Sequence, residues 1–196
     1  MPINDIIDAS STAAVISNPR LPDNPIVACN DAFVRLTGYD RDEIIGRNCR
    51  FLRGAETEDE LSEILRTAIS KRQPAMVEIT NYKKNGAAFR NAVMIAPMFD
   101  DDGELEYFLG SQMEVPVGAR PAADDRRRIA AERIETLTGR QRQILLLMSA
   151  GKLNKQIAYE LGLSERTIKM HRSALFRSLG VQTSADAIRL AVEAGY

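Results

Sequence analysis

The sequence predicts two domains: an α+β domain built on a five-stranded antiparallel sheet, followed by an all-α domain of four helices. Apolar segments of strand length, separated by turn residues, dominate the first 117 residues, and two helical patterns interrupt them. Residues 137–196 carry helical patterns only. A length of 196 residues suits two small domains that each bury a core.

The charge distribution marks the same division. Residues 1–117 hold 12 Lys and Arg against 19 Asp and Glu, a net charge of −7, whereas residues 118–196 hold 14 against 8, a net charge of +6. The basic excess lies mainly in residues 137–181, a distribution typical of nucleic-acid binders. We therefore expect a first domain at 1–117, a linker and connecting helix at 118–136, and a second domain at 137–196.

The remaining composition narrows the class of protein. The first five residues carry acid where a signal peptide carries base, and no apolar run approaches the roughly 18 residues of a membrane span. Two cysteines and a single histidine predict neither a disulfide framework nor a metal site. We expect a reduced cytoplasmic protein without metal or membrane partner.

Periodicity and turn residues define the elements of the first domain in order. Asn30 caps a short helix that ends at Gly38, and Thr57 with Glu60 forms a capping box that opens a longer helix. Asn85-Gly86 is the strongest hairpin signal in the chain. The predicted strands are 13–16, 26–29, 75–82, 87–97 and 105–115, and the predicted helices are 31–37 and 57–71.

Three amide side chains lie on apolar strand faces. Asn81, Asn91 and Gln112 each share a strand face with apolar neighbours, because side chains alternate along a strand. A buried amide without a partner costs on the order of 1–3 kcal/mol, so three of them favour a planar polar ligand such as an isoalloxazine ring. The alternative is that they bridge strands or meet water at the sheet edge.

One string of residues identifies a candidate family. Gly46–Leu52 places Cys49 between an amide and a guanidinium. It resembles the flavin-binding signature of light-oxygen-voltage (LOV) domains, the blue-light-sensing branch of the PAS fold. The resemblance covers roughly residues 10–115 and includes the motifs Asn30–Phe33, Leu36–Tyr39, Asn81–Gly86, Phe89–Asn91 and Phe108–Gln112. It implies that the Cys49 thiol adds to a photoexcited flavin in a sensor that is not an enzyme.

The resemblance also implies a flavin site. Asn81 and Asn91 would hydrogen-bond the flavin edge, Gln112 would sense N5 and O4, Asn48 would meet the ribityl chain, and two arginines would hold the phosphate with their forked donors. The short loop at 54–56 favours FMN over FAD. The assigned residues are Asn48, Cys49, Arg50, Arg66, Asn81, Asn91, Phe108, Gly110 and Gln112.

Arg53 and Cys29 refine this interpretation. Arg53 stands where the family usually has glutamine, so one ribityl or phosphate contact must change. Cys29 lies on a predicted strand without the flanking asparagine and arginine, and we expect it to pack in the core. A thiol with an ordinary pKa of roughly 8.5 is mostly neutral, so the expected reaction is that of a neutral thiol.

The strand faces turned away from the predicted flavin are also apolar. They carry Met94 and Ala96 on one strand and Leu109, Met113 and Val115 on another. A sheet exposed to water on one side alternates more cleanly. We expect the following chain, a second copy of the domain, or both to cover this outer face.

The second half predicts a linker, a connecting helix and a helix-turn-helix. Residues 116–125 are typical of a linker, and 124–136 of a charged connecting helix. A helix at about 138–150, one at 154–161, a glycine-bearing turn at 162–164 and a basic helix at 165–179 follow the helix-turn-helix order. A last helix over 184–194 has one apolar stripe, namely Ala187, Ile188, Ala191 and Val192.

Residues 136–196 resemble the LuxR-type DNA-binding domain. The motifs are Leu137-Thr138-x-Arg140, Asn154-Lys155-x-Ile157-Ala158, Leu163-Ser164-x-x-Thr167-Ile168-Lys169-x-His171 and Leu179-Gly180-Val181. The resemblance implies base contacts from Lys169, Met170 and Ser173, and phosphate contacts from Lys155, Ser164, Thr167, His171 and Arg172. Gln141 and Gln143 replace glutamates common in the family, which removes possible ion pairs within the domain.

The two resemblances together predict a blue-light-regulated transcription factor that binds double-stranded DNA. Formation of the Cys49–flavin adduct would release the helix-turn-helix domain from the sheet and allow a light-state homodimer. The residues expected in the dark-state or dimer interface are Ala187, Ile188, Ala191, Val192, Met94, Leu109 and Met113. One alternative is a flavin redox sensor of the same architecture. Another is a small flavoenzyme with a DNA anchor, which lacks a histidine acid or base in the first half.

Overall fold

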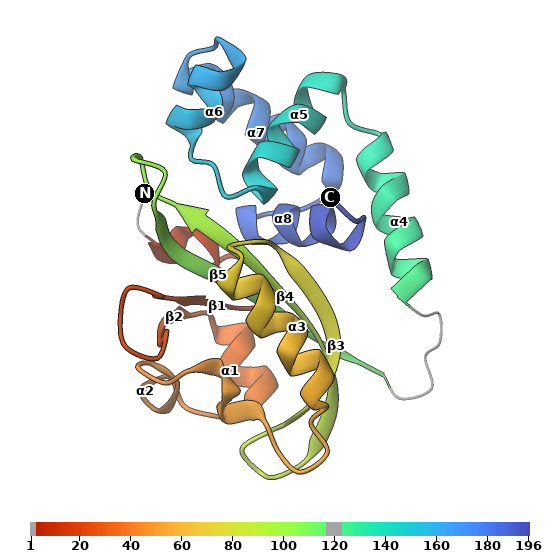
Figure 1. Cartoon of the computed structure of the whole chain (residues 1–196). Helices are drawn as coiled ribbons and strands as arrows, with labels where there is room; N and C mark the ends of the chain where they lie inside the picture. Colours follow the sequence, from red (N-terminus) through yellow and green to blue (C-terminus); the bar gives the residue numbers. More distant parts are fainter. Residues whose placement is uncertain (1–2, 117–122) are drawn as a thin grey trace.

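A five-stranded sheet divides the molecule into two layers of helices. The structure is a computed structural model that describes residues 3–116 and 123–196 (Figure 1). We call residues 3–116 the sheet domain and residues 123–196 the helical domain. Within the predicted linker, residues 117–122 lie outside the described residues.

The predicted antiparallel sheet is confirmed, with the strand order β2-β1-β5-β4-β3. Its strands are β1 (Ala13–Ser17), β2 (Ile26–Cys29), β3 (Ala75–Tyr82), β4 (Ala88–Phe99) and β5 (Leu105–Val115). Val93 pairs with Gln112 and Ile79 with Asn91, so the three amides come from adjacent positions on three neighbouring strands. Gly86 turns the β3–β4 hairpin at a φ of +82°, which favours glycine.

One face of the sheet, the inner face, is covered by helices of the sheet domain (Figure 1). They are α1 (Asp31–Thr37), α2 (Arg41–Ile44), α3 (Asp59–Ser70) and the 3-10 helix η2 (Cys49–Leu52). The 3-10 helix η1 (Ile3–Ile6) belongs to the opposite face, because Ile6 packs in the apolar cluster that contains Met94 and Leu109. Asn30 caps α1 as predicted, because its side-chain oxygen accepts from the Phe33 amide at 3.0 Å. The single-turn elements α2, η1 and η2 were not predicted, because one turn is too short to show a period.

The predicted capping box at Thr57 and Glu60 is wrong. The helix α3 begins at Asp59, and the Thr57 hydroxyl donates instead to the Thr80 carbonyl of β3 at 2.7 Å. It also accepts from the Gly54 amide at 2.9 Å. The Thr57 hydroxyl thus bonds to the backbone of strand β3 and does not cap the helix.

The helical domain contains the helices that the second half predicts. They are α4 (Ala123–Glu135), α5 (Gly139–Ser149), α6 (Asn154–Leu161), α7 (Glu165–Leu179) and α8 (Ser184–Glu193). Gln141 closes a capping box, since its side-chain oxygen accepts from the Thr138 amide at 2.9 Å. The turn between α6 and α7 uses Gly162 at a φ of +65° and Ser164 as the N-cap of α7.

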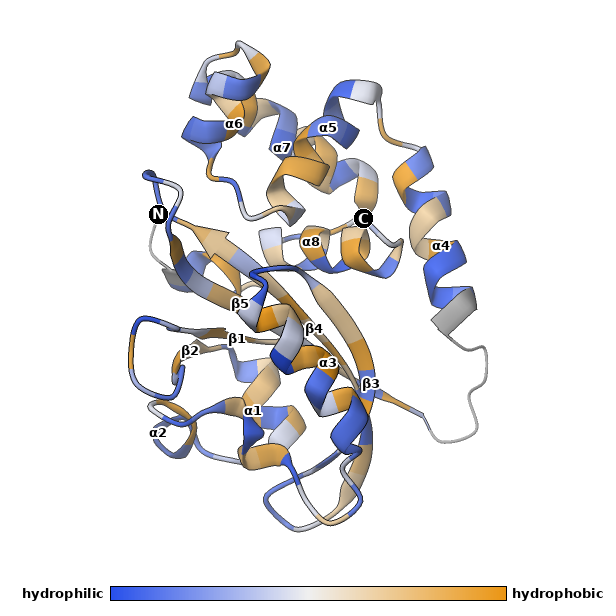
Figure 2. Cartoon of the chain, in the orientation of Figure 1, coloured by the Kyte–Doolittle hydropathy of each residue, from blue (hydrophilic) through white to orange (hydrophobic). Residues whose placement is uncertain are grey.

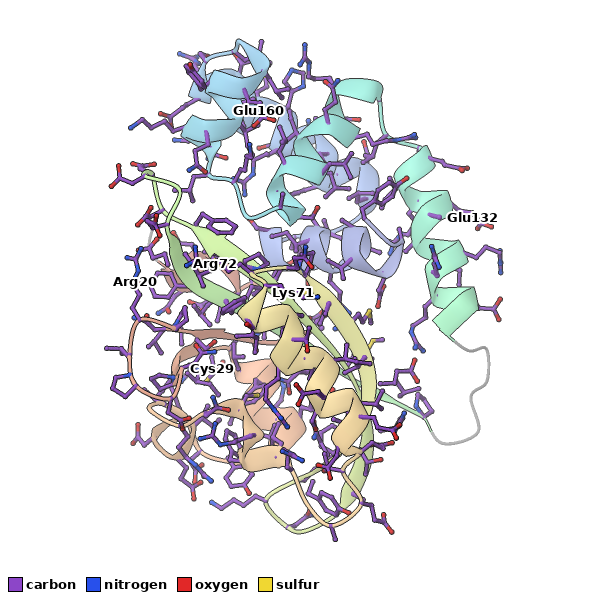
Figure 3. All side chains as sticks on the ribbon, in the orientation of Figure 1. Arg20, Cys29, Lys71, Arg72, Glu132 and Glu160 are labelled. Atoms are coloured by element: carbon purple, nitrogen blue, oxygen red, sulfur yellow. The ribbon has the colours of Figure 1, made fainter. Side chains whose placement is uncertain are left out.

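The helix α4 is more than the connector that its charge suggests. Ala130 and Ile134 are each 1% exposed and belong to the same apolar cluster as α8. Arg128 and Glu132 form an ion pair of 2.6 Å, and Figure 3 shows Glu132 on the outer side of α4. Two apolar residues four positions apart make too narrow a stripe to stand out among so many charges.

The helical domain covers the outer face of the sheet. The helix α8 contacts β3, β4 and β5, and Figure 2 shows apolar residues on both sides of this junction. One buried apolar cluster runs through both domains and includes Met94, Leu109 and Ile188. The following chain is therefore the element that covers this face, although Met113 is only half-buried and outside the cluster.

The predicted stripe of α8 does not face the sheet as a unit. Arg189 bonds to the sheet, and successive residues of a helix are about 100° apart, so Ala187 and Ala191 lie about 160° from Arg189. Both alanines are fully buried, and α8 also contacts α5 and α4. We infer that these two alanines close the core of the helical domain, which corrects their assignment to the sheet-facing surface.

Among the helices of the described segments, none has the length and apolar character to cross a bilayer.

Candidate functional site: a polar-ended cavity and a basic helix

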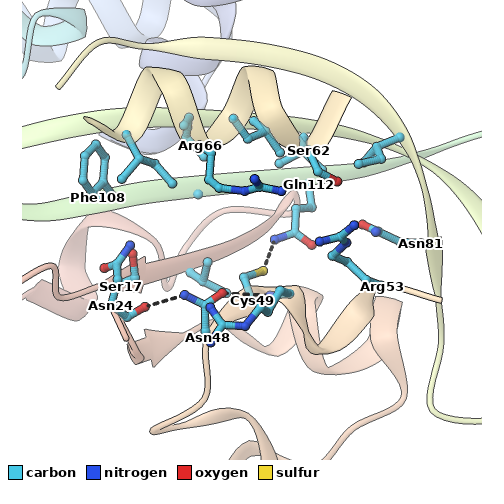
Figure 4. A pocket seen from close by; sticks show the side chains of 18 residues that line it. Ser17, Asn24, Asn48, Cys49, Arg53, Ser62, Arg66, Asn81, Phe108 and Gln112 are labelled. Carbon is cyan, nitrogen blue, oxygen red and sulfur yellow. Dashed lines mark hydrogen bonds between the residues drawn. The ribbon is translucent and has the colours of Figure 1, made fainter. Parts of the chain in front are cut away.

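A cavity of about 240 Å³ lies between the inner face of the sheet, η2 and α3 (Figure 4). Its volume is near the lower end of ordinary small-molecule sites, which begin at roughly 300 Å³. Eight predicted residues line it, namely Asn48, Cys49, Arg50, Arg66, Asn81, Phe108, Gly110 and Gln112. The local fold therefore collects side chains from η2, α3, β3 and β5 in one place.

Cys49 begins the 3-10 helix η2, for which Asn48 is the N-cap. The Gln112 amide nitrogen donates to the Cys49 sulfur at 3.3 Å, as Figure 4 shows. Burial raises the pKa of Cys49 to about 11, although the hydrogen bond from Gln112 lowers it. The thiol is therefore neutral at physiological pH.

The three amides form a connected group beside the cavity, which Asn81 and Gln112 line and Asn91 does not. The Asn91 nitrogen donates to the Asn81 oxygen at 2.9 Å and lies 3.4 Å from the Gln112 oxygen. Asn91 is completely buried, and its own side-chain oxygen has no hydrogen-bond partner in the protein. A buried acceptor of this kind fits a ligand that brings an N–H donor.

The polar atoms of the Asn48 side chain already have hydrogen-bond partners within the protein. Its nitrogen donates to the Asp23 carbonyl at 2.6 Å, and its oxygen accepts from the Arg50 amide at 3.0 Å. Asn48 thus holds η2 against the loop before β2. The nitrogen also donates to the Asn24 carbonyl at 3.4 Å, so a ribityl contact from Asn48 would use the second lone pair of its oxygen.

Two predicted arginines lie at the rim of the cavity. Arg50 pairs with Asp23, and Arg66 pairs with Glu63. Their side chains are 58% and 61% exposed, so both guanidinium groups can reorient toward an anion at the mouth.

Further lining residues were missed from the sequence. The helix α3 contributes Ser62, Leu65 and Ile69 beside Arg66, at the 3-4-7 spacing of one helix face. That spacing was available as a signal. Arg53 also lines the cavity, and it pairs with Asp59 at 2.6 Å.

Gly110 is required by the packing of the cavity floor. A Cβ built at this position would lie 2.9 Å from a methyl group of Val15 on the neighbouring strand β1. A side chain here would also enter the cavity, which Gly110 lines. The glycine therefore leaves a flat surface that a planar ligand can approach.

Cys29, as predicted, is a packed core residue. It is 1% exposed, belongs to the apolar cluster beneath β1 and β2, and does not line the cavity. Burial raises the pKa of Cys29, and the nearby Arg41 lowers it.

Comparison with known families agrees with this geometry. The PAS domain family matches residues 12–115, which is more than half of the chain. The chain belongs to the PAS domain family. Its PAS domain is of the LOV type, and residues 135–191 match the bacterial regulatory proteins of the luxR family.

Similar proteins support the LOV assignment. The LOV domain of the EL346 blue-light-activated histidine kinase of Erythrobacter litoralis is 35% identical, with a TM-score of 0.51, over 53% of this chain and 95% of that one. The light-state LOV structure of the blue-light photoreceptor Aureochrome1 is 37% identical, with a TM-score of 0.53, over 59% of this chain and 90% of that one.

The curated relatives are longer proteins. The blue-light-activated histidine kinase 1 of Erythrobacter litoralis is 48% identical over 122 residues, which is 61% of this chain and 34% of that protein. A Brucella anthropi blue-light-activated histidine kinase is 45% identical over 58% of this chain and 23% of its own length. The chain thus spans about a third or less of these relatives.

The LuxR-type domain presents a basic helix to solvent. On α7, Lys169 and Ser173 are exposed, Met170 is 64% exposed, and His171 is half-buried. Ser164 and Thr167 share a hydrogen bond of 2.8 Å at the N-terminus of α7. Lys155 lies 3.8 Å from Asp101 of the LOV domain.

Arg172 does not point to solvent, which corrects its assignment to a phosphate contact. Its guanidinium donates to the Asn154 side chain and, at 2.6 Å, to the Ser184 hydroxyl. Burial lowers its pKa. Arg172 therefore ties α7 to α6 and α8 within the LuxR-type domain, a role that a surface pattern cannot reveal.

Proposed function

We propose that the chain is a blue-light-regulated DNA-binding transcription factor that holds FMN in the LOV cavity. The observation that carries the proposal is the Gln112–Cys49 contact of 3.3 Å on the strand β5, whose other face is covered by the LuxR-type domain. A single strand therefore borders both the reactive thiol and the DNA-binding domain.

The cavity fits a flavin by its donor set. The amides of Asn81 and Gln112, which line the cavity, suit the polar edge of an isoalloxazine ring, and Asn91 donates a hydrogen bond to each of them. Arg50 and Arg66 suit a phosphate monoester, which favours FMN over FAD. A bound flavin supplies blue-light absorption and a ring carbon that forms a bond with the Cys49 sulfur.

Cys49 and Gln112 would convert this event into motion. With a flavin bound, the sulfur of the neutral Cys49 thiol would bond to a ring carbon and its proton would pass to a ring nitrogen, and the Gln112 amide nitrogen would then lose its acceptor. Gln112 must reorient to find a new partner, because an unpaired buried amide costs on the order of 1–3 kcal/mol. Strand β5 carries that change toward the LuxR-type domain.

Release of the LuxR-type domain would then permit dimerisation and DNA binding. A dimer places two recognition helices about one DNA turn apart. Lys169, Met170 and Ser173 would meet base edges, while Lys155, Ser164, Thr167 and His171 would lie toward phosphates. A reversal from 1:99 to 99:1 in the population of the open form needs about 5.5 kcal/mol.

The test compares visible absorption in the dark and after a blue flash for the parent chain, Cys49→Ala and Cys29→Ala. We expect reversible loss of the flavin band in the parent and in Cys29→Ala, and none in Cys49→Ala. Cys29 is the matched control because it is the other free thiol, is buried, and lies outside the cavity. Bleaching that survives in Cys49→Ala, or a colourless protein, would refute the proposal.

A flavin redox sensor is the second candidate, and Arg53 favours it. Its guanidinium is a third positive group on the cavity wall, where it favours a more negative state of the ligand. Chemical reduction in the dark should then change DNA affinity in Cys49→Ala as well. An unchanged DNA affinity on reduction would exclude this alternative.

A further inference from the structure

An arginine is buried in the junction between the two domains. Arg189 of α8 is 5% exposed, and its guanidinium donates to the Ser111 hydroxyl at 3.1 Å and to the Ala92 carbonyl at 3.2 Å. Its Nε lies 3.2 Å from Glu193 on the same helix. The first two partners belong to the LOV sheet, so the α8 arginine bonds directly to the other domain.

The surroundings of Arg189 are otherwise apolar or committed to other bonds. Met94 and Leu109, which flank Ser111 on the outer face, are fully buried in the cluster that joins the domains. Asp186, one turn earlier on α8, accepts from the Ser10 hydroxyl at 2.5 Å. Burial lowers the pKa of Arg189, whereas Glu193 raises it. The buried guanidinium has therefore lost its hydration, and its hydrogen bonds to Ser111, Ala92 and Glu193 replace it.

Ser111 and Gln112 are consecutive residues of β5, and their side chains lie on opposite faces of the sheet. Gln112 reaches the Cys49 sulfur on the inner face, and Ser111 reaches Arg189 on the outer face. One peptide unit thus joins the bond to the reactive thiol and the bond to α8. A twist of β5 that reorients Gln112 also displaces the Ser111 hydroxyl.

A directed bond responds to such a displacement more sharply than an apolar contact does. Burial of apolar surface has no preferred direction, so methyl groups can slide with little loss. A hydrogen bond weakens steeply when its angle falls toward 120°. A buried charge that loses one partner cannot recover it from water until the domains separate.

We propose that Arg189 is the positioning residue that couples Gln112 to release of the helical domain, through its hydrogen bond with Ser111. The proposal rests on the proposed function and names the contact that regulates it. The apolar cluster provides the area of the closed junction, and the Arg189–Ser111 bond makes that junction sensitive to the state of β5.

The experiment uses the full chain with Ser111→Ala, Arg189→Lys and the double variant. Ser111→Ala removes the acceptor but leaves Gln112, Cys49 and the cavity intact. Arg189→Lys keeps the charge but loses the fork that reaches both Ser111 and Ala92. Arg128→Lys is the matched control, because Arg128 is 60% exposed and forms its ion pairs within α4.

The open fraction is measured in the dark and in the light by hydrogen exchange of the α8 backbone and by sedimentation velocity. We expect each single variant to raise the dark ratio of open to closed molecules about tenfold, equivalent to about 1.4 kcal/mol. The double variant should exceed either single variant by much less than a further tenfold, since both remove the same bond. In the light the ratio should equal that of the parent, because the bond is already broken.

Two results would overturn the proposal. One is a Ser111→Ala variant with an unchanged dark ratio, and the other is an equal rise in dark and light, which would make the contact structural only. Visible bleaching is recorded on the same samples. If the parent chain does not bleach, the proposed photochemistry is refuted. The ratio of open to closed molecules in the dark would still show whether Ser111 and Arg189 hold the domains together.

Discussion

The amide of Phe99 in the LOV domain donates to the carbonyl of Gly151 in the LuxR-type domain at 3.2 Å. Gly151 has a φ of +83°, and a Cβ at this position would lie 2.5 Å from the Pro97 carbonyl. The glycine therefore serves two purposes, because it ends α5 in a left-handed conformation and lets a strand of the other domain approach closely.

Gly151→Ala should open the two domains, while Gly162→Ala should not. Both glycines are left-handed, and we expect each substitution to lower the free energy of unfolding by about 1 kcal/mol through backbone strain. A Cβ at Gly162 meets nothing within 4 Å, whereas one at Gly151 meets Pro97 and Phe99. A lower sedimentation coefficient in the dark should appear for Gly151→Ala only. Identical coefficients for the two variants would contradict this reading of the junction.

Gln112→Leu should leave the light-induced bleaching intact but weaken the light-induced dimerisation. Leucine keeps most of the volume but removes the donor to Cys49 and the acceptor near Asn91. We expect bleaching to persist and the light-induced rise in dimer to fall about tenfold, because β5 no longer holds a side chain that must reorient. Absorption and sedimentation of the same sample test this. A normal dimer response would exclude Gln112 from the signal route.

The buried thiol predicts a pH dependence of alkylation and of stability. The pKa of Cys49 is raised to about 11, so in Cys29→Ala the dark alkylation rate should climb roughly tenfold per pH unit up to about pH 11. The stability that accompanies the raised pKa is complete below the ordinary thiol pKa and is lost as pH rises through about 11. Iodoacetamide kinetics followed by mass spectrometry measure the rate. A plateau near pH 9 would show an ordinary thiol.

The Glu58 carboxylate should contribute to the loss of LOV-domain stability at acid pH. Burial raises its pKa, but hydrogen bonds from the Thr80 amide and Arg90 outweigh this and bring it to about 2. Its contribution is present above about pH 4.5 and is lost as pH falls through about 2. Glu58→Gln should cost roughly 0.5–1 kcal/mol at pH 7, as partly exposed pairs do.

Urea denaturation at pH 7 and pH 3 measures this effect. The difference between parent and Glu58→Gln should be reduced but still measurable at pH 3 and should vanish only near pH 2. Glu63→Gln is the control, because the Glu63 side chain is 59% exposed and pairs with Arg66 on the same helix. A difference that disappears by pH 4 would contradict the lowered pKa.

Lys169→Ala and Arg172→Ala should weaken DNA binding for different reasons. Removal of the exposed Lys169 side chain should weaken duplex binding by about 1–3 kcal/mol and relax the base preference at its position, without changing stability. Arg172→Ala should cost about 2 kcal/mol of stability, because Asn154 and Ser184 lose a buried partner. Salt titrations with a DNA duplex and denaturation curves distinguish the two. A stable Arg172→Ala with a reduced slope would restore Arg172 as a phosphate contact.

The cavity illustrates what local patterns can predict. Strand alternation and the Gly46–Leu52 motif were enough to name Cys49 and the amides, because a period of two assigns each strand residue to a face. The helices of the LuxR-type domain were predictable for the same reason, since their caps and turns lie within a few residues of one another. Arg53 was noticed as a departure from the family, but its place on the cavity wall was not.

Long-range partners explain most of what was missed or wrong. Thr57 was predicted in a capping box but bonds to the Thr80 carbonyl of β3. Arg172 was predicted to contact DNA but bonds to Asn154 and Ser184. Arg189 went unnoticed, because its partners Ser111 and Ala92 precede it by 78 and 97 positions. Helix and strand periods contain no information about which distant group a polar side chain will meet.

The sequence by itself determined the two domain types, the five strands and the identity of the thiol, because these follow from short-range periods, caps and motifs. Tertiary structure decided how the domains join, which face of α8 meets the sheet, and that a buried arginine bonds across the junction. The physical reason is that burial of a polar group is costly unless the group finds a hydrogen-bond partner, and that partner comes from a distant part of the folded chain.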